Sequence, residues 1–271
     1  MSKRILIASI SLALMATNLF AGGHCAADKT LTEGKFTIAT GNPAYFPWVL
    51  DDAPESGKGF EAAVAYAVAK EMGFAEQDVV WVRSSFDEAI QPGVKNFDIN
   101  MQQYSITAER DQVVDFSVPY YTAPMAVLVG AGATDTKPTI AALKGLKWGA
   151  VGSTTAVQKI ANVVQPTADP LLYGDNADVN AAITANQIDG AMFDLPTALF
   201  LSAVMIEGSK VIGQFPPETS DNADQFGMLM EEGNPLKACV DAALTAMIEN
   251  GTLASIEAQW LQDTTGVPLI K

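Results

Sequence analysis

Two residues of opposite charge could bind the two ends of a small zwitterion. Arg110 offers a planar guanidinium whose parallel N–H groups suit a carboxylate. Asp194 follows an apolar segment and could pair with an ammonium group. Both have ordinary alternatives. Arg110 could pair at the surface with Glu109, Asp111 or Asp115, and Asp194 could cap a helix starting at Pro196. Residue type and spacing alone leave these alternatives open.

A second polar group could add hydrogen bonds to the same anion. Gly152, Ser153 and Thr154 follow a strand-like segment and open a helical one. Their backbone N–H groups and the Thr154 hydroxyl could therefore donate at the positive end of a helix. Ser105 could make one further hydrogen bond. Ordinary capping or turn formation explains the same residues, and capping is compatible with binding.

The elements that must position these residues alternate between strand and helix. In the first half, apolar periodicity predicts strands at 36–40, 79–82 and 97–102, and helices at 59–72 and after Ser84 or Ser85. In the second half it predicts strands at 147–151, 171–173 and 188–193, and helices at 154–163, 177–185 and 196–205. This alternation is typical of mostly parallel sheets with helices on both faces, whose ligands bind at the carboxyl ends of the strands.

Two extended, proline-containing stretches, 118–124 and 214–224, separate these halves from the rest of the chain. A strand at 226–230 and helices at 235–249 and 252–261 follow them. We therefore expect an α/β protein of two lobes joined by a two-strand hinge. The first lobe takes residues 28–122 and 224–271, and the second takes 123–223. Such lobes could close over a ligand by hinge motion.

The N-terminus predicts export. Lys3 and Arg4 precede an apolar run over 5–16, and small residues follow it. The run falls short of the roughly 20 apolar residues that span a bilayer. Residues 1–27 are therefore interpreted as a signal peptide, with the mature chain starting near residue 28. Cuts after Ala21, Ala26 or Ala27 would all place a small residue before the cleaved bond.

A lipid anchor on Cys25 is the alternative localisation. Gly22 and His24 depart from the residues that usually precede a lipid-modified cysteine, so a free periplasmic protein is favoured. Removal of residues 1–27 would also leave Cys239 as the single cysteine. Cys239 lies on an apolar helical stripe, where we expect it to be core.

The charge and composition exclude several classes of function. Loss of Lys3 and Arg4 makes the formal charge of −15 more negative by two units. So acidic a surface repels nucleic acid, and no nucleic-acid partner is expected. No histidine would remain after processing to activate a thiol or to bind a metal. We predict no catalytic residue, no metal and no cofactor.

Several motifs in order resemble the polar amino-acid-binding proteins of ABC importers, which have the periplasmic-binding-protein-like fold. Residues 105–110 match the family pattern Ser-Ile-Thr-x-x-Arg, and residues 114–120 match Val-x-Phe-Ser-x-Pro-Tyr. Residues 59–61 (Gly-Phe-Glu), residues 152–154 (Gly-Ser-Thr) and Asp194 extend the match from about 36 to 261. The resemblance implies capture of a free amino acid and its delivery to a membrane permease by a monomer.

The resemblance also implies roles for the site residues. Arg110, Ser105, Ser153 and Thr154 would bind the α-carboxylate, and Asp194 would bind the α-ammonium group. Tyr45 and Phe86 would enclose the aliphatic part of the ligand between aromatic rings.

The side-chain end of the site departs from the family pattern. Binders of basic amino acids tend to carry an aspartate in the first loop, where this chain has Gly41 and Asn42. Gln102 and Gln103 stand where small residues are common. A buried cationic side chain would need a carboxylate, so we expect a neutral polar ligand. The alternative is that Asp51, Asp52 or Glu61 supplies the missing charge.

Two other functions fit the same fold. A secreted dehydratase-like enzyme would need a cleft acid with a raised pKa. A sensor module would need a following transmembrane or signalling segment, and the residues after 261 hold none. The sequence therefore favours a binding protein that leaves its ligand unchanged.

Overall fold

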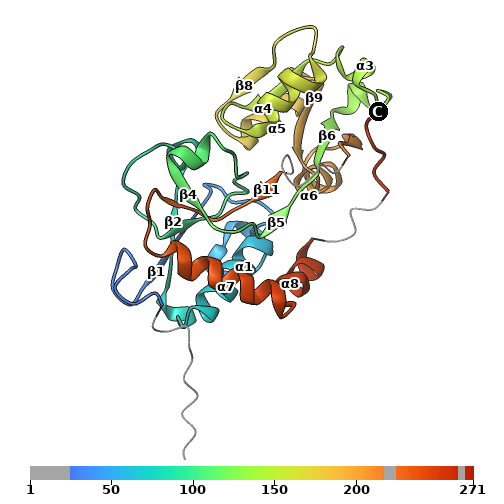
Figure 1. The fold of residues 1–271 in the computed structure, drawn as a ribbon. Helices are drawn as coiled ribbons and strands as arrows, with labels where there is room; N and C mark the ends of the chain where they lie inside the picture. The colour runs from blue at the N-terminus through green and yellow to red at the C-terminus, as the bar shows by residue number, and fades with distance from the viewer. Residues whose placement is uncertain (1–24, 217–223, 262–265) are drawn as a thin grey trace, which may run out of the picture.

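The computed structural model describes residues 25–216, 224–261 and 266–271, which form two lobes (Figure 1). Most of the predicted signal peptide and most of the stretch 214–224 lie outside the described residues. On the predicted boundary between the lobes at 223 and 224, only residue 224 is described. None of the described helices is long and apolar enough to cross a membrane.

The first lobe is built on a sheet with the strand order β2-β1-β3-β12-β4. Its strands are β1 (Phe36–Thr40), β2 (Val79–Arg83), β3 (Ile99–Asn100), β4 (Val114–Phe116) and β12 (Leu229–Glu231). β1 runs parallel to β2 and β3, whereas β12 is antiparallel to β3 and β4. The α-helices are α1 (Phe60–Glu71), the short α2 (Phe86–Ala89), α7 (Lys237–Glu249) and α8 (Thr252–Trp260). Apolar residues of β1, α1, α7 and α8 share one core.

The second lobe is built on a sheet with the strand order β10-β6-β9-β7-β8. Its strands are β6 (Met125–Val129), β7 (Trp148–Val151), β8 (Leu171–Tyr173), β9 (Gly190–Asp194) and β10 (Lys210–Gln214). β7 is parallel to β8 and β9, while β6 is antiparallel to β9 and β10. The α-helices are α3 (Ile140–Leu143), α4 (Thr155–Lys159), α5 (Asn176–Thr184) and α6 (Leu195–Phe200). Alternate β6 residues enter two separate cores, which places one core on each face of this sheet.

Two short strands connect the lobes. β5 (Tyr121–Thr122) and β11 (Gln225–Phe226) pair antiparallel between the two sheets (Figure 1). These findings confirm the expected α/β fold of two lobes with a two-strand hinge.

The last residues of the chain differ from the prediction that 224–271 belongs to the first lobe. Ile270 is buried in the core of the second lobe, and its N–H donates to the carbonyl oxygen of Gln214 at 2.8 Å. In return, the Gln214 N–H donates to the carbonyl oxygen of Pro268 at 2.9 Å. The edge strand β10 thus supplies backbone partners for this segment, so residues 268–271 pack on the second lobe.

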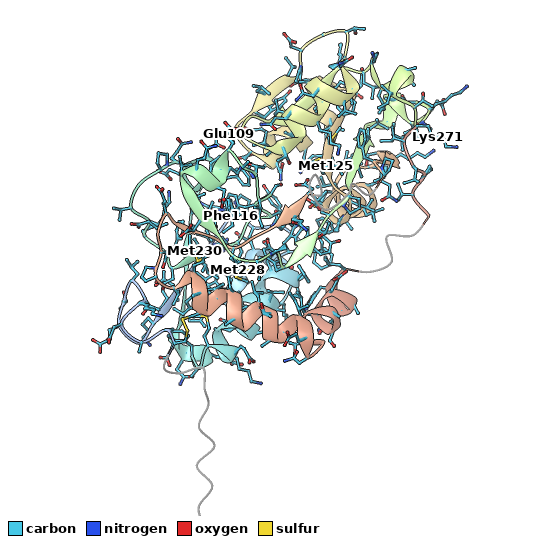
Figure 2. All side chains as sticks on the ribbon, viewed as in Figure 1. Glu109, Phe116, Met125, Met228, Met230 and Lys271 are labelled. Atoms are coloured by element: carbon cyan, nitrogen blue, oxygen red, sulfur yellow. A yellow bond between two sulfur atoms is a disulfide. The ribbon has the colours of Figure 1, made fainter. Side chains whose placement is uncertain are left out.

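Cys239 lies in the core, as predicted, but it is not an unpaired cysteine. Cys239 is buried on α7, as the apolar stripe predicts. It is bonded to Cys25 in a disulfide that joins positions 214 residues apart, drawn as a yellow bond in Figure 2. A single unpaired cysteine was expected because Cys25 was assigned to the signal peptide.

Candidate ligand-binding cleft

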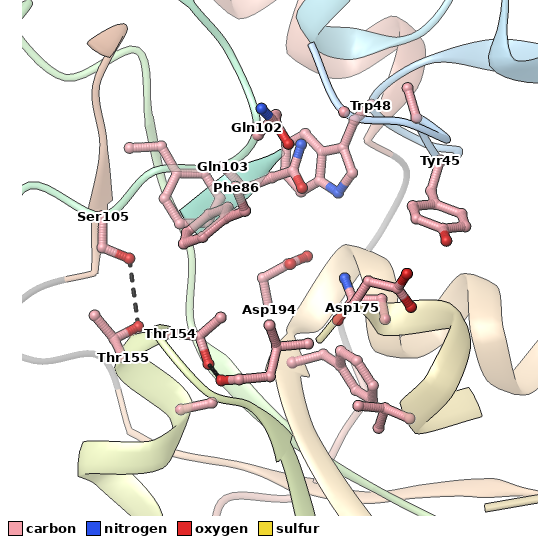
Figure 3. Close-up of a pocket in the computed structure, with 18 of the residues that line it drawn as sticks. Tyr45, Trp48, Phe86, Gln102, Gln103, Ser105, Thr154, Thr155, Asp175 and Asp194 are labelled. Atoms are coloured by element: carbon pink, nitrogen blue, oxygen red, sulfur yellow. Dashed lines mark hydrogen bonds between the residues drawn. The ribbon is translucent and has the colours of Figure 1, made fainter. Parts of the chain in front are cut away.

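A cavity of about 260 Å³ lies between the two lobes (Figure 3). The first lobe contributes the loops that follow β1 and β3, and the second contributes the ends of β7 and β9 with the starts of α4 and α5. Every predicted site residue except Ser153 lines this cavity: Asn42, Tyr45, Phe86, Gln102, Gln103, Ser105, Arg110, Thr154 and Asp194.

Arg110 is a buried cation at this cavity, with 8% of its surface exposed. Its Nη1 donates to the carbonyl oxygen of Ser105 and its Nη2 to that of Ser153, both at 2.8 Å. The guanidinium carbon lies 5.4 Å from the centre of the Phe86 ring. Burial lowers the pKa of Arg110, while nearby Asp224 acts in the opposite direction. The alternative of a surface arginine paired with its acidic neighbours is therefore wrong.

Asp194 ends β9 and caps α6, so the alternative that it serves as a helix cap is correct. This role is compatible with its place at the cavity. One carboxylate oxygen accepts the Thr197 N–H at 2.8 Å, and the residue lines the cavity. Burial raises the pKa of Asp194 to about 6, with a further contribution from the negative charge of Asp224. A carboxylate so poorly solvated gains much from a cationic partner.

The hydroxyl groups near the start of α4 are arranged differently from the prediction. Thr154 donates its hydroxyl proton to the carbonyl oxygen of Val151 at 2.8 Å, so it does not donate into the cavity in this conformation. Ser105 lies across the cleft from Thr155, with 3.4 Å between their hydroxyl oxygens (Figure 3). Ser153 contributes its carbonyl oxygen to Arg110, and its hydroxyl donates to the carboxylate of Asp87.

Glu61 fixes the turn that carries Gln103. Gln103 has a backbone φ of 54°, in the left-handed region that a residue with a side chain seldom adopts. The buried Glu61 carboxylate accepts the Gln103 N–H at 2.8 Å and its side-chain amide at 2.6 Å, and it also accepts the Tyr120 hydroxyl. Burial raises the pKa of Glu61 to about 7, against the lowering effect of these donors.

The two glutamines present acceptors rather than donors to the cavity. Gln102 uses its amide nitrogen on Asn100 Oδ1 at 3.0 Å and on the Tyr104 hydroxyl at 2.9 Å. Gln103 uses its amide nitrogen on Glu61. Each amide therefore keeps its carbonyl oxygen for a partner, and both side chains lie across the cavity from Asp194 (Figure 3).

Tyr45 supplies a further polar group at the cavity. Its hydroxyl is buried, and it has no hydrogen-bond partner among the described residues. Burial raises the pKa of Tyr45, and the negative charge of Asp175 adds to the shift. Asp175 caps α5 by accepting the Asp178 N–H at 2.9 Å and also lines the cavity. A buried hydroxyl without a partner is costly, so a ligand that pairs with it would be favoured.

Direct hydrogen bonds link the lobes around the cavity. Besides the bond from Arg110 to Ser153, the indole N–H of Trp48 in the first lobe donates to Thr197 Oγ1 in the second at 2.8 Å. Thr197 in turn hydrogen-bonds Asp194 through both its backbone and its side chain. Trp48 thus reaches the Asp194 carboxylate through one intervening hydroxyl, and it can do so only when the lobes are together.

We expect Trp48→Phe to weaken ligand binding about fivefold, because closure then forms one hydrogen bond fewer, worth about 1 kcal/mol. Trp81→Phe is the matched control, since Trp81 donates its indole N–H to Tyr66 at 3.3 Å within the first lobe. Isothermal titration calorimetry on both variants tests the effect. Equal affinities for the two variants would remove Trp48 from the closure mechanism.

Several cavity residues were not predicted as site residues. Trp48, Thr155, Asp175 and Asp224 line the cavity with Glu61, which was named only as an alternative partner for a basic ligand. Three of the four residues from Tyr45 to Trp48, after the first strand, are aromatic, which is a signal that could have drawn attention to the indole. Asp175 before a predicted helix looked like an ordinary cap, which it also is.

Two α/β lobes with a charged cavity between them and a two-strand connection are the architecture of periplasmic binding proteins, whose lobes close around a ligand. The model of bacterial extracellular solute-binding proteins, family 3, matches residues 37–263. The chain therefore belongs to this family, which confirms the resemblance found in the sequence.

Relatives and solved structures agree with this assignment. The L-arginine-binding protein of Pseudomonas aeruginosa is 25% identical over 265 residues, covering 96% of each chain. An ancestral arginine-binding protein bound to glutamine is 26% identical, with a TM-score of 0.70 over 86% of this chain and 100% of that one. The ancestral amino acid-binding protein AncCDT-1, a precursor of cyclohexadienyl dehydratase, is 26% identical, with a TM-score of 0.68 over 84% of this chain and 96% of that one.

Proposed function

We propose that the protein captures a free amino acid outside the cytoplasm and delivers it, as a monomer, to the membrane permease of an ABC importer. The observation that carries this proposal is the placement of one buried guanidinium, Arg110, and one half-buried carboxylate, Asp194, on opposite lobes of the same cavity. An α-amino acid carries one carboxylate and one ammonium group, and each needs a partner once water is expelled. A ligand that pairs with both residues would hold the lobes together.

The test is to identify what the protein retains. Protein purified without refolding should release one amino acid per chain on denaturation, and mass spectrometry should show it chemically unchanged. After refolding in the absence of ligand, a thermal-shift screen should single out the same compound. A ligand at 100 times its dissociation constant adds about 2.7 kcal/mol to stability, which is easily measured. A screen of the common amino acids without any shift would contradict the proposal.

The side-chain end of the cavity supports a ligand whose side chain donates hydrogen bonds. The carbonyl oxygens of Gln102 and Gln103 can accept, and the Tyr45 hydroxyl needs a partner. Amide and guanidinium side chains both satisfy acceptors of this kind. The ancestral arginine-binding protein seen with glutamine indicates that one scaffold of this fold can take either.

Within this class we propose a preference for a neutral amide such as glutamine, as the sequence predicts, although relatives are named for arginine. In support, the first loop has glycine and asparagine at positions 41 and 42, where binders of basic amino acids tend to carry an aspartate, and Glu61 already accepts from Gln103 and Tyr120. Asp52 is also engaged, because it accepts from Arg83 at 2.5 Å. Two other carboxylates line the cavity: Asp224 lies near Arg110 and Asp194, whereas Asp175 lies near Tyr45 and could serve a cationic side chain.

Competition between glutamine and arginine decides this preference. We expect glutamine to bind more tightly, and Asn42→Asp to shift the preference toward arginine by adding a carboxylate of nearly the same shape. Gly41 is a poorer place for it, because a Cβ there would lie 3.1 Å from Gln102 Oε1. Asp175→Asn, which keeps a good helix cap, should leave glutamine affinity unchanged. Tighter arginine binding that Asp175→Asn abolishes would overturn the preference and identify Asp175 as the partner.

An enzyme is the second candidate, because AncCDT-1 is a precursor of a dehydratase and Glu61 has a pKa raised to about 7. Three donors nevertheless bind the Glu61 carboxylate, which suits a structural role for this acid. The mass-spectrometric test above separates the two functions, since an enzyme would return a changed compound.

A further inference from the structure

We propose that Cys25 stays in the mature protein as half of a structural disulfide with Cys239, so that the signal peptide ends at Ala21 and Cys25 carries no lipid. The two residues form a disulfide in the structure, with their Cα atoms 5.7 Å apart. This assigns a modification to both cysteines and a processing site to the chain. It does not depend on the proposed function.

The residues around Cys25 are integrated into the first lobe. Ala26 is 5% exposed and belongs to the core formed by β1, α1 and α7, and Cys25 packs against the same core. A little further on, the Leu31 N–H donates to the carboxylate of Asp98 at 2.6 Å, and Asp98 is itself buried. A chain that began at residue 28 would lack Ala26 and uncover part of this core.

Retention of Cys25 selects among the candidate cleavage sites. Cuts after Ala26 or Ala27 would remove Cys25 and leave Cys239 as a buried free thiol. Of the three cuts that fit the sequence, only the one after Ala21 keeps the disulfide, and the mature chain then begins at Gly22.

The same bond decides against a lipid anchor. Lipid attachment forms a thioether on the cysteine sulfur and makes that cysteine the first residue of the mature chain. A sulfur in a disulfide has no valence left for a thioether, so the two modifications exclude each other. Disulfide formation removes two electrons and two protons from the two thiols. A thiol–disulfide exchange protein of an oxidising extracytoplasmic compartment would accept them.

The cleft should not depend on the bond. Neither cysteine lines the cavity, and the bond joins the N-terminal segment to α7 within one lobe. A crosslink over such a long stretch of chain chiefly restricts the unfolded state. We therefore expect the disulfide to contribute to stability and to leave ligand affinity unchanged.

The first test uses the unaltered full-length chain, exported by a Gram-negative host. Its intact mass should match a start at Gly22 less two hydrogens, with no lipid. A maleimide reagent in denaturant should label no cysteine before reduction and two after it. A mass beginning at residue 26 or later, a lipid adduct, or two thiols reactive before reduction would each overturn the proposal.

The second test uses cysteine variants. Cys25→Ser, Cys239→Ser and the double variant should each lower the melting temperature by the same amount, roughly 5–15 °C. Reduction of the unaltered protein should give the same shift, and it should not shift the double variant further. If the variants prove too unstable to purify, the mass and thiol measurements still decide. An unaltered melting temperature after complete reduction would contradict a structural role for the bond.

Discussion

Replacement of Arg110 by alanine is expected to abolish measurable amino-acid binding while the protein stays folded. Arg110 is the buried cation of the cavity, and its loss would strand the ligand carboxylate without a charged partner. Truncation of one member of a buried charge pair typically costs about 2–5 kcal/mol, a loss of roughly 30- to 5,000-fold in affinity. Arg110→Lys should also bind poorly, because an ammonium group cannot reproduce the paired donors of the guanidinium.

Calorimetry with the identified ligand measures this loss, and circular dichroism checks the fold. Lys237→Ala is a suitable control, because it removes one positive charge at a half-buried ion pair with Asp241 on α7, away from the cavity. Its affinity should match that of the unaltered protein. Near-normal affinity in Arg110→Ala would place the carboxylate site elsewhere in the cleft.

The sequence predicts the residues that follow strands better than the contacts they make. The carboxyl ends of parallel strands meet at one edge of a sheet, so Asp194 at the end of β9 could be placed from periodicity alone. Arg110 could not be placed in this way, because a surface arginine paired with acidic neighbours was equally consistent with the spacing. Only the family motif pointed to the cleft. The predicted roles of the hydroxyl groups were less secure, since a hydroxyl such as that of Thr154 can rotate toward any nearby carbonyl oxygen.

Long-range pairings were not predictable. Glu61 and Gln103 are 42 residues apart, and nothing in either segment indicates that one carboxylate will hold the other's left-handed turn. The antiparallel strands β6 and β10 were missed because both lie beside the extended stretches that were interpreted as connections. The position of Ile270 on the second lobe depends on the edge of β10, which the sequence did not reveal as a strand.

The affinity for the ligand is expected to fall as the pH is lowered through about 6, because the Asp194 carboxyl must be ionised to pair with the ligand ammonium group. Burial raises the pKa of this carboxyl to about 6 in the unliganded protein, and a bound cation would lower it again. Between these two pKa values, binding must displace a proton, and affinity should drop up to tenfold per pH unit. Above about pH 7 the affinity should be constant. Titration calorimetry from pH 5 to pH 8 measures the profile.

Asp194→Asn tests the assignment, because asparagine keeps the cap on α6 and removes only the charge. The variant should lose roughly 30-fold or more in affinity at pH 7.5, and residual binding should lack the step near pH 6. Its unliganded form should be no less stable at pH 8. A carboxyl whose pKa is higher in the folded protein than in the unfolded chain lowers stability as the pH rises from about 4 to 6, and Asn removes that cost. Asp175→Asn, a second cap at the same cavity, should retain the step. A step that persists in Asp194→Asn and disappears in Asp175→Asn would transfer the ammonium site to α5.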